Sequence, residues 1–193
     1  MFIQTEDTPN PASLKFLPGE PVLGAGAPPM DFPTFESAEG SPLARALFAV
    51  DGVVSVLLGA DFVTVSKDQT VDWVHIKPSV LGVIADHYAA GLPALEAGAG
   101  APKAGANLDD YEGETREIVE QIVELLDTRV RPAVAQDGGD ITFSRYEEGE
   151  GVVFLHMQGA CAGCPASTYT LKQGVENMLK HYVPEVTRVE AVA

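Results

Sequence analysis

A run of small residues and prolines near the middle of the chain argues against a single continuous core. Residues 91–106 are dominated by Ala, Gly and Pro and offer almost nothing to bury, which is typical of a flexible linker. Each flanking piece of the 193-residue chain lies near the lower end of the size range of domains. We therefore predict a domain at 1–90, a linker at 91–112 and a second domain at 113–193.

The first piece is a series of short segments separated by turns. Residues 41–42, Ser-Pro, are an N-cap followed by proline in the first helical turn, and they predict a helix to 48. Residues 59–61, Gly-Ala-Asp, predict a hairpin between two β-branched runs. Helical spacing from 80 to 87 predicts a closing helix, and 74–77 is too short to assign. The expected strands are 3–5, 14–17, 30–35, 53–58 and 62–66, and the piece is a small α+β unit.

The second piece has clearer periodicity. Apolar residues from 115 to 130 fall on one helical face, and this predicts a helix that ends before Pro132. Alternation at 141–144 and the apolar run 152–157 predict two strands, followed by helical spacing at 171–182 and a short β-like segment at 186–192. The turn Asp137-Gly138-Gly139-Asp140 calls for positive φ at glycine. The order helix-strand-strand-helix-strand predicts an α+β unit with helices on one face of a three-stranded sheet.

Composition narrows the classes of partner. The formal net charge is −16, which argues against nucleic acid, whose phosphates need a basic surface, and against an anionic membrane. The amino-terminal residues resemble neither a secretory signal nor a transit peptide. Two cysteines in all exclude a secreted disulfide framework and fit a reducing compartment. These features predict a soluble, cytoplasmic protein.

The two cysteines, Cys161 and Cys164, lie together where a strand-like run ends and a helix-like run begins. Gly163 permits a tight path between them, and Pro165 suits a first helical turn, so free amides there are expected to lower the thiol pKa. A pair of thiolates chelates soft metals, but a tetrahedral zinc or an iron–sulfur cluster usually takes four ligands. One chain is therefore half a metal site, which a second copy or a client protein would complete.

Other interpretations of the pair stay open. The cysteines could be a buried inert pair, a thioredoxin-like redox pair or half of a zinc site. Against the redox pair, they follow the third element of a small domain rather than the first strand of a βαβ unit, and Pro165 lies outside the pair. His156 in an apolar strand is read as a core histidine, and no Ser/His/Asp arrangement or phosphate-binding glycine loop is evident.

The chain resembles the NifU-like (Nfu) family of iron–sulfur cluster carriers. The resemblance covers both pieces and leaves out the linker. In the second piece it rests on residues 130–132, 137–141, 159–165 and 170–172 with Glu176. In the first piece it rests on residues 1–5, 8–11, 14–16, 41–44 and 59–65.

What the resemblance implies is a carrier and not an enzyme. Two carboxy-terminal domains would share one [4Fe–4S] cluster, each giving Cys161 and Cys164, with [2Fe–2S] left open. The chain would be a homodimer on cluster binding, receive its cluster from upstream assembly proteins and deliver it to apo-proteins by thiolate exchange at an exposed site. The amino-terminal domain would help to recognise clients or modulate the site. The alternative function is a dithiol/disulfide oxidoreductase that uses the same cysteines.

Overall fold

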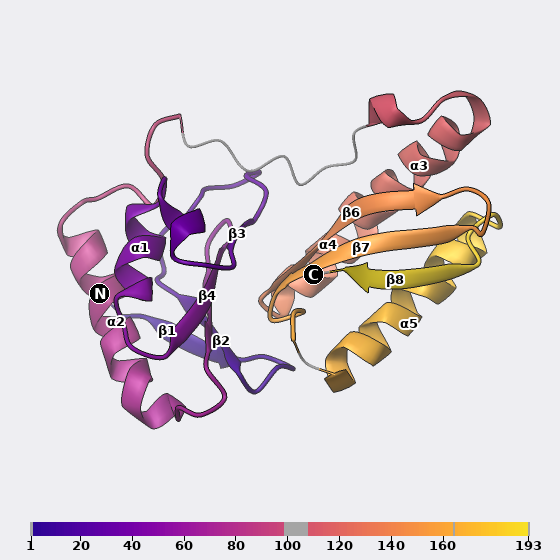
Figure 1. Cartoon of the computed structure of the whole chain (residues 1–193). Coiled ribbons are helices and arrows are strands. Elements are labelled where there is room, and N and C mark those ends of the chain that lie inside the picture. Colours follow the sequence, from indigo (N-terminus) through magenta and orange to yellow (C-terminus); the bar gives the residue numbers. More distant parts are fainter. Residues whose placement is uncertain (1, 99–107, 164, 193) are drawn as a thin grey trace. The chain divides into compact units, whose positions relative to one another are not determined.

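The computed structural model of the chain describes residues 2–98, 108–163 and 165–192, and for 165–168 it describes the backbone alone. The chain forms two compact units, Met1–Pro102 and Lys103–Ala193 (Figure 1). Both units mix helices and strands, which confirms the predicted α+β class with two small domains. The predicted domain bounds stay predictions, and residues 99–107 of the predicted linker lie outside the described part.

The first unit is built on a five-stranded antiparallel sheet in the order β1-β2-β5-β4-β3. Strands β4 and β5 form the predicted hairpin, with Leu58 paired to Val63. The strands are β1 (Gln4–Asp7), β2 (Ser13–Leu17), β3 (Met30–Phe32), β4 (Val53–Leu58) and β5 (Val63–Lys67).

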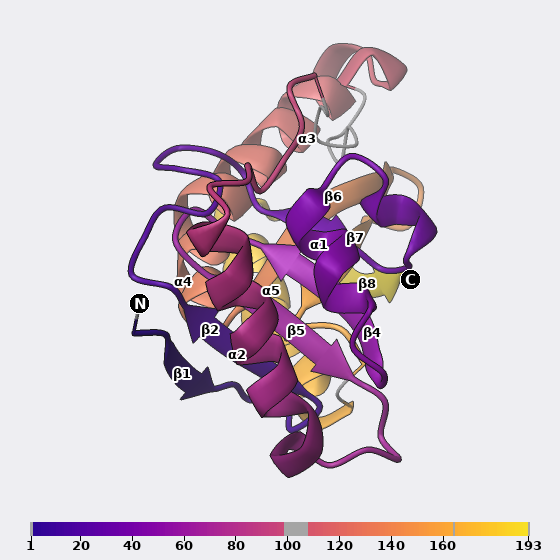
Figure 2. The ribbon, with the colours of Figure 1, turned by 90° about the vertical axis from the view of Figure 1, so that its left-hand side faces the viewer.

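Two helices, α1 (Pro42–Phe48) and α2 (Trp73–Ala89), lie on one face of this sheet (Figure 2), and a short 3-10 helix, η1 (Glu36–Ala38), precedes them. Ser41 caps α1 as predicted, because its Oγ accepts a hydrogen bond from the Ala44 N–H at 3.1 Å. Helix α2 begins well before the predicted position and includes Pro78. Pro78 is the sixth residue of α2 and cannot donate a backbone hydrogen bond to the preceding turn, yet the helix continues to Ala89.

Part of the segment predicted as linker packs on the units. Ala94 and Leu95 contact the core of the first unit, and Ser41 Oγ donates to the Ala94 carbonyl at 2.7 Å. In the second unit, a short 3-10 helix, η2 (Leu108–Asp110), precedes Tyr111, whose hydroxyl accepts the Tyr146 N–H at 2.8 Å. The packed part of each unit therefore extends into the composition-defined linker.

The second unit is a three-stranded sheet in the order β6-β7-β8, covered on one face by helices (Figure 1). Strands β6 (Gly139–Glu147) and β7 (Val152–Gly159) are antiparallel, and β8 (Arg188–Val192) runs parallel to β7. Helix α5 (Pro165–Tyr182) makes the crossover between these parallel strands, as such a connection requires. The predicted order of elements is confirmed.

The predicted end of the first helix before Pro132 is wrong. Helix α3 (Gly113–Leu125) continues through a π-helical stretch, η3 (Leu126–Val130), into α4 (Arg131–Gln136). The wider π turn shifts the hydrogen-bond ladder, and Pro132 falls in the first turn of α4, where its missing N–H is not needed. The helical segment therefore reaches the turn at Asp137.

The core of the second unit joins the helices to the inner face of the sheet. It contains Ile122, Leu126, Ile141, Leu155, Leu179, Val189 and, at its edge, Cys161. None of the described helices is long and apolar enough to cross a membrane.

Candidate metal centre

Cys161 lies in a tight turn directly after β7. The Ala160 N–H donates to the Gly138 carbonyl at 3.1 Å, and the Cys161 N–H donates to the Gln158 carbonyl at 3.2 Å. Gly159 and Gly163 have φ of 59° and 74°, values that glycine adopts without steric cost. Helix α5 then begins at Pro165, as predicted. The turn therefore connects the end of a central strand to the start of a long helix.

The Cys161 side chain is buried, with 5% of its surface exposed. It packs on Gly139, which pairs with Gly159 across the two strands, and a Cβ built on Gly139 would overlap Cys161 Sγ. The prediction of an exposed loop is wrong at this residue, although Ala162 and Gly163 beside it are exposed. The reason is that β6 presents a glycine where any larger residue would push the sulfur out.

Burial also reverses the expected pKa of this thiol. Desolvation, and to a lesser extent the nearby carboxylates of Asp140 and Asp137, together raise the pKa of Cys161 to about 12. The prediction that free amides at the helix start lower this pKa is therefore wrong for Cys161. A metal that binds a thiol displaces its proton, so iron binding here would include the work of removing a firmly held proton.

Cys164, the second predicted ligand, lies outside the described residues. The described residues contain no group of three or more His, Cys, Asp and Glu that could hold a metal ion. Cys161 and Cys164 therefore stay the predicted ligands.

A buried ion pair lies behind the turn. Asp140 is fully buried, and the Arg131 guanidinium donates to both of its carboxylate oxygens, from Nε and Nη2, at 2.9 Å each. Arg131 Nη1 also donates to Asp127 Oδ1 at 2.9 Å. Burial opposes the charge of Arg131, but the hydrogen bonds with Asp140 and Asp127 outweigh it and raise the pKa of the guanidinium. The pair thus ties α4 to the start of β6, next to the glycine that holds Cys161.

The sequence predicts a simple turn at residues 137–140 and does not reveal this ion pair. Gly138 does have the expected positive φ, 76°. The available signal was a lone arginine before a proline and an aspartate directly after two glycines, and only the fold brings them together. His156 is half-buried on β7 rather than a core residue as predicted.

The cysteine turn follows the first strand of a βαβ unit, where thioredoxin-like redox pairs also lie. Strand β7, helix α5 and strand β8 form a βαβ unit, so the predicted distinction from a strand–helix redox site does not hold. A buried thiol with a raised pKa is nevertheless a poor nucleophile, because exchange with a disulfide proceeds through the thiolate.

Comparison with known families gives two matches. Residues 3–91 match the model described as "Scaffold protein Nfu/NifU N terminal", and residues 122–190 match the model described as "NifU-like domain". These matches cover both units, including the β6–β7 turn and the cysteine turn. The two matches together cover most of the chain, which belongs to the NifU-like (Nfu) family.

The similarity to known proteins covers almost the whole chain. It is 54% identical, over all of its length, to the NFU1 iron-sulfur cluster scaffold homolog, mitochondrial, of Drosophila ananassae, and it spans 64% of that protein. It is 51% identical over 98% of its length to NifU-like protein 4, mitochondrial, of Arabidopsis thaliana, and spans 65% of it. The solution structure of a NifU-like protein from Saccharomyces cerevisiae is 32% identical, with a TM-score of 0.46, over 49% of this chain and 84% of that one.

These relatives contradict the prediction of a cytoplasmic protein, because both are named mitochondrial. The cysteine content that supported the prediction indicates only a compartment that keeps thiols reduced.

Proposed function

We propose that two copies of this chain share one [4Fe–4S] cluster through Cys161 and Cys164 and pass it to apo-proteins. The observation that carries the proposal is the turn that joins β7 to α5, where Gly139 makes room for Cys161 within the residues that match the NifU-like domain. Counting ligands supports the sharing, because a cluster of this type takes four thiolates and the chain has two cysteines. This role makes the chain a carrier and not an enzyme.

Delivery would be an exchange of thiolates on iron. A client thiol replaces one carrier thiolate, an iron–sulfur bond to the client forms as the bond to the carrier breaks, and the client's proton ends on the released carrier thiol. No electrons are transferred, so no oxidant or reductant is needed. Repeating this step at each ligand moves the intact cluster, with [2Fe–2S] as the other cargo of the same chemistry.

Cys161 has to leave its buried position before it can share a cluster with a second copy. The turn can change conformation to allow this movement of Cys161, because Gly159 and Gly163 flank the cysteine and both have positive φ. Glycine has a conformational freedom that other residues lack. The neighbouring Ala162 and Gly163 are already exposed. We infer that cluster loading remodels this turn while β7 and α5 stay in place.

The test is anaerobic reconstitution with iron and sulfide, followed by iron analysis and native mass spectrometry. We expect about four iron per dimer, lost in Cys161→Ala and in Cys164→Ala and kept in the surface control Glu120→Ala. A loaded species that is a single chain with all its metal, and no outside thiol, would refute the shared site. Zinc kept through purification, with unfolding on chelation, would instead indicate a structural zinc site.

The oxidoreductase alternative is tested on the same preparation. Reduction of insulin disulfides by the cluster-free protein, lost in Cys161→Ala, would favour it over the carrier. We expect no such activity, because the described thiol of the pair is buried and its pKa is raised to about 12.

A further inference from the structure

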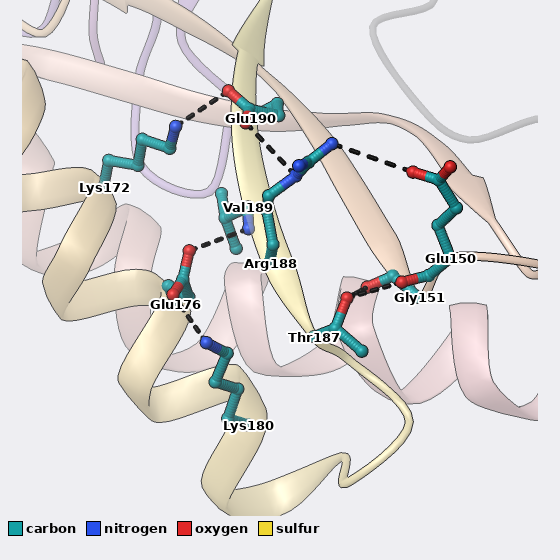
Figure 3. A network of polar contacts seen from close by, with 9 residues as sticks. All are labelled: Glu150, Gly151, Lys172, Glu176, Lys180, Thr187, Arg188, Val189 and Glu190. Atoms are coloured by element: carbon teal, nitrogen blue, oxygen red, sulfur yellow. Dashed lines mark hydrogen bonds and ion pairs between the residues drawn. The ribbon is translucent and has the colours of Figure 1, made fainter.

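Helix α5 and strand β8 are joined by a set of directional polar contacts, which Figure 3 shows. Lys172, Glu176 and Lys180 are spaced four residues apart on α5, so they lie along one face of the helix. That face meets β8. None of these side chains has a role in the ligand exchange described above.

Glu176 is the centre of this face. Its Oε2 accepts the Val189 N–H of β8 at 3.0 Å, and its Oε1 accepts a hydrogen bond from Lys180 Nζ at 2.6 Å. Among the described strands, β8 pairs with β7 alone, so this backbone donor belongs to a sheet edge that helix α5 covers. A backbone donor satisfied by a charged side chain fixes both partners, because hydrogen bonds to ionised groups are short and strong.

Lys172 makes the contact nearer to the cysteine turn. Its Nζ lies 2.7 Å from Glu190 Oε2, and Arg188 holds the other oxygen of the same carboxylate at 3.3 Å. Lys172 stands seven residues after Pro165, about 10 Å along a helix that rises about 1.5 Å per residue. The pair therefore acts on the half of α5 that begins at the cysteines.

The polar face of α5 is connected to the cysteine turn through β8, because β8 pairs with β7 and β7 leads into that turn. Strand β8 is in register with β7, from Val152 opposite Arg188 to His156 opposite Val192, and β7 ends in the turn that carries Cys161. Helix α5 starts directly after Cys164. Apolar contacts of α5, such as those of Val175 and Leu179, are not directional, and they leave rotation and sliding of the helix weakly restricted.

We propose that Glu176 and Lys172 are positioning residues, which lock α5 against β8 and thereby hold in place the helix that follows the cysteine turn. The inference rests on the proposed function. Its consequence concerns retention: a carrier must hold its cluster firmly enough to deliver it intact and loosely enough to let it go, and these contacts would set that balance without touching the metal. Outer contacts that orient metal ligands have effects of this kind.

The experiment measures how fast an iron chelator removes the cluster from the reconstituted full-length dimer. We expect Glu176→Ala to lose its cluster about tenfold faster than the wild type, with an unchanged spectrum before chelation. Glu176→Gln keeps an acceptor for the Val189 N–H and is expected to restore most of the wild-type rate. Lys172→Met should also speed the loss, and Lys172→Arg should restore it, since Arg can pair with Glu190.

The matched control is Glu120→Ala, which removes an exposed i,i+4 pair with Arg116 on α3. A wild-type rate in Glu176→Ala, or equal acceleration in Glu120→Ala, overturns the proposal. If Glu176→Ala does not fold, Lys172→Met decides alone, because it leaves no backbone donor unpaired: faster loss supports the proposal and a wild-type rate overturns it. A wild type that binds no cluster refutes the proposed function instead, so the two failures are distinct.

Discussion

Each unit has a glycine on which a side chain packs. In the first unit that side chain is close to the glycine in the sequence, and in the second unit it is distant. In the first unit, a Cβ on Gly59 would overlap the ring of Phe62, which follows it in the same hairpin. In the second unit, a Cβ on Gly139 would overlap Cys161, which follows the end of the neighbouring strand β7. The first contact shapes a local turn, and the second places a candidate ligand.

The ion pairs of the two units differ in burial, although each joins residues nine positions apart. In the first unit, Lys15 pairs with Glu6 at 3.3 Å, and the glutamate side chain is 43% exposed. In the second unit, the carboxylate of Asp140 is fully buried and held by two hydrogen bonds from Arg131. A buried pair is seldom a net source of stability, because desolvation offsets its attraction. The Arg131–Asp140 pair lies next to Gly139, which indicates that it orients the cysteine turn more than it stabilises the second unit.

The sharpest test of this contrast is Arg131→Met. It leaves the Asp140 carboxylate buried without its partner, and we expect a loss of about 3–5 kcal/mol from the free energy of unfolding of the second unit. The measurement is denaturant unfolding followed by circular dichroism and by fluorescence. Trp73 is the single tryptophan of the chain and packs on the first core, so its fluorescence midpoint should stay in place.

Two variants check that prediction. Arg116→Met removes an exposed pair whose side chains are 47% and 49% exposed, and should change stability by about 0–1 kcal/mol. Asp140→Asn in the Arg131→Met background should recover part of the loss. No recovery would show that the arginine acts through packing and not through its charge.

A second test replaces the two packed-upon glycines. We expect Gly139→Ala to destabilise the second unit by about 1–3 kcal/mol through overpacking and to leave cluster loading intact, because Cys161 leaves this buried position when it binds the cluster. Gly59→Ala should destabilise the first unit and leave loading unchanged. Both quantities come from the same unfolding curves and iron analyses.

The chain provides its own controls for the glycine series. Nothing lies within 4 Å of a Cβ on Gly149, so Gly149→Ala should have little effect. Adding Cys161→Ala to Gly139→Ala removes the overlapping sulfur and should return stability toward that of Cys161→Ala alone. If the stability loss of the double variant equals the sum of the losses of the two single variants, the contact between Gly139 and Cys161 does not cause the destabilisation by Gly139→Ala.

Ser41→Ala tests whether the units depend on one another. It removes the cap of α1 and the hydrogen bond to the Ala94 carbonyl, and should cost the first unit about 1 kcal/mol. The Trp73 fluorescence midpoint should fall while iron per dimer stays constant. A parallel fall in iron content would contradict independent units.

The smallest expected effect is a dependence on pH. The hydrogen bond from Lys180, followed by that from the Val189 N–H, lowers the pKa of Glu176 from 4.5, and Lys172 adds to the effect through its charge. A carboxyl whose pKa is lower in the folded state contributes stability above 4.5, and this is lost as pH falls through the folded-state pKa.

We therefore expect the unfolding free energies of wild type and Glu176→Gln to converge for the second unit as the pH is lowered below 4.5. Trp73 fluorescence should report no difference between the two proteins at any pH. A gap that stays constant in acid would show that Glu176 does not act through its charge.

The amino-acid sequence by itself determined the two α+β units, the β4–β5 hairpin, the order of elements in the second unit and the place of the cysteines between a strand and a helix. These features depend on local signals, such as apolar spacing, the Ser41 cap and glycines in turns, which act over a few residues.

Tertiary structure alone decided the environment of the site. The residues next to Cys161 in the sequence do not predict that Gly139 makes room for its sulfur or that Asp140 and Arg131 form an ion pair. They also do not predict that Glu176 reaches the edge of β8. The burial and the raised pKa of Cys161 follow from those contacts, because desolvation depends on which surfaces the fold brings together and not on neighbours along the chain. A helix also passed through Pro132 because a π turn, invisible to apolar spacing, moved the proline to a position that tolerates it.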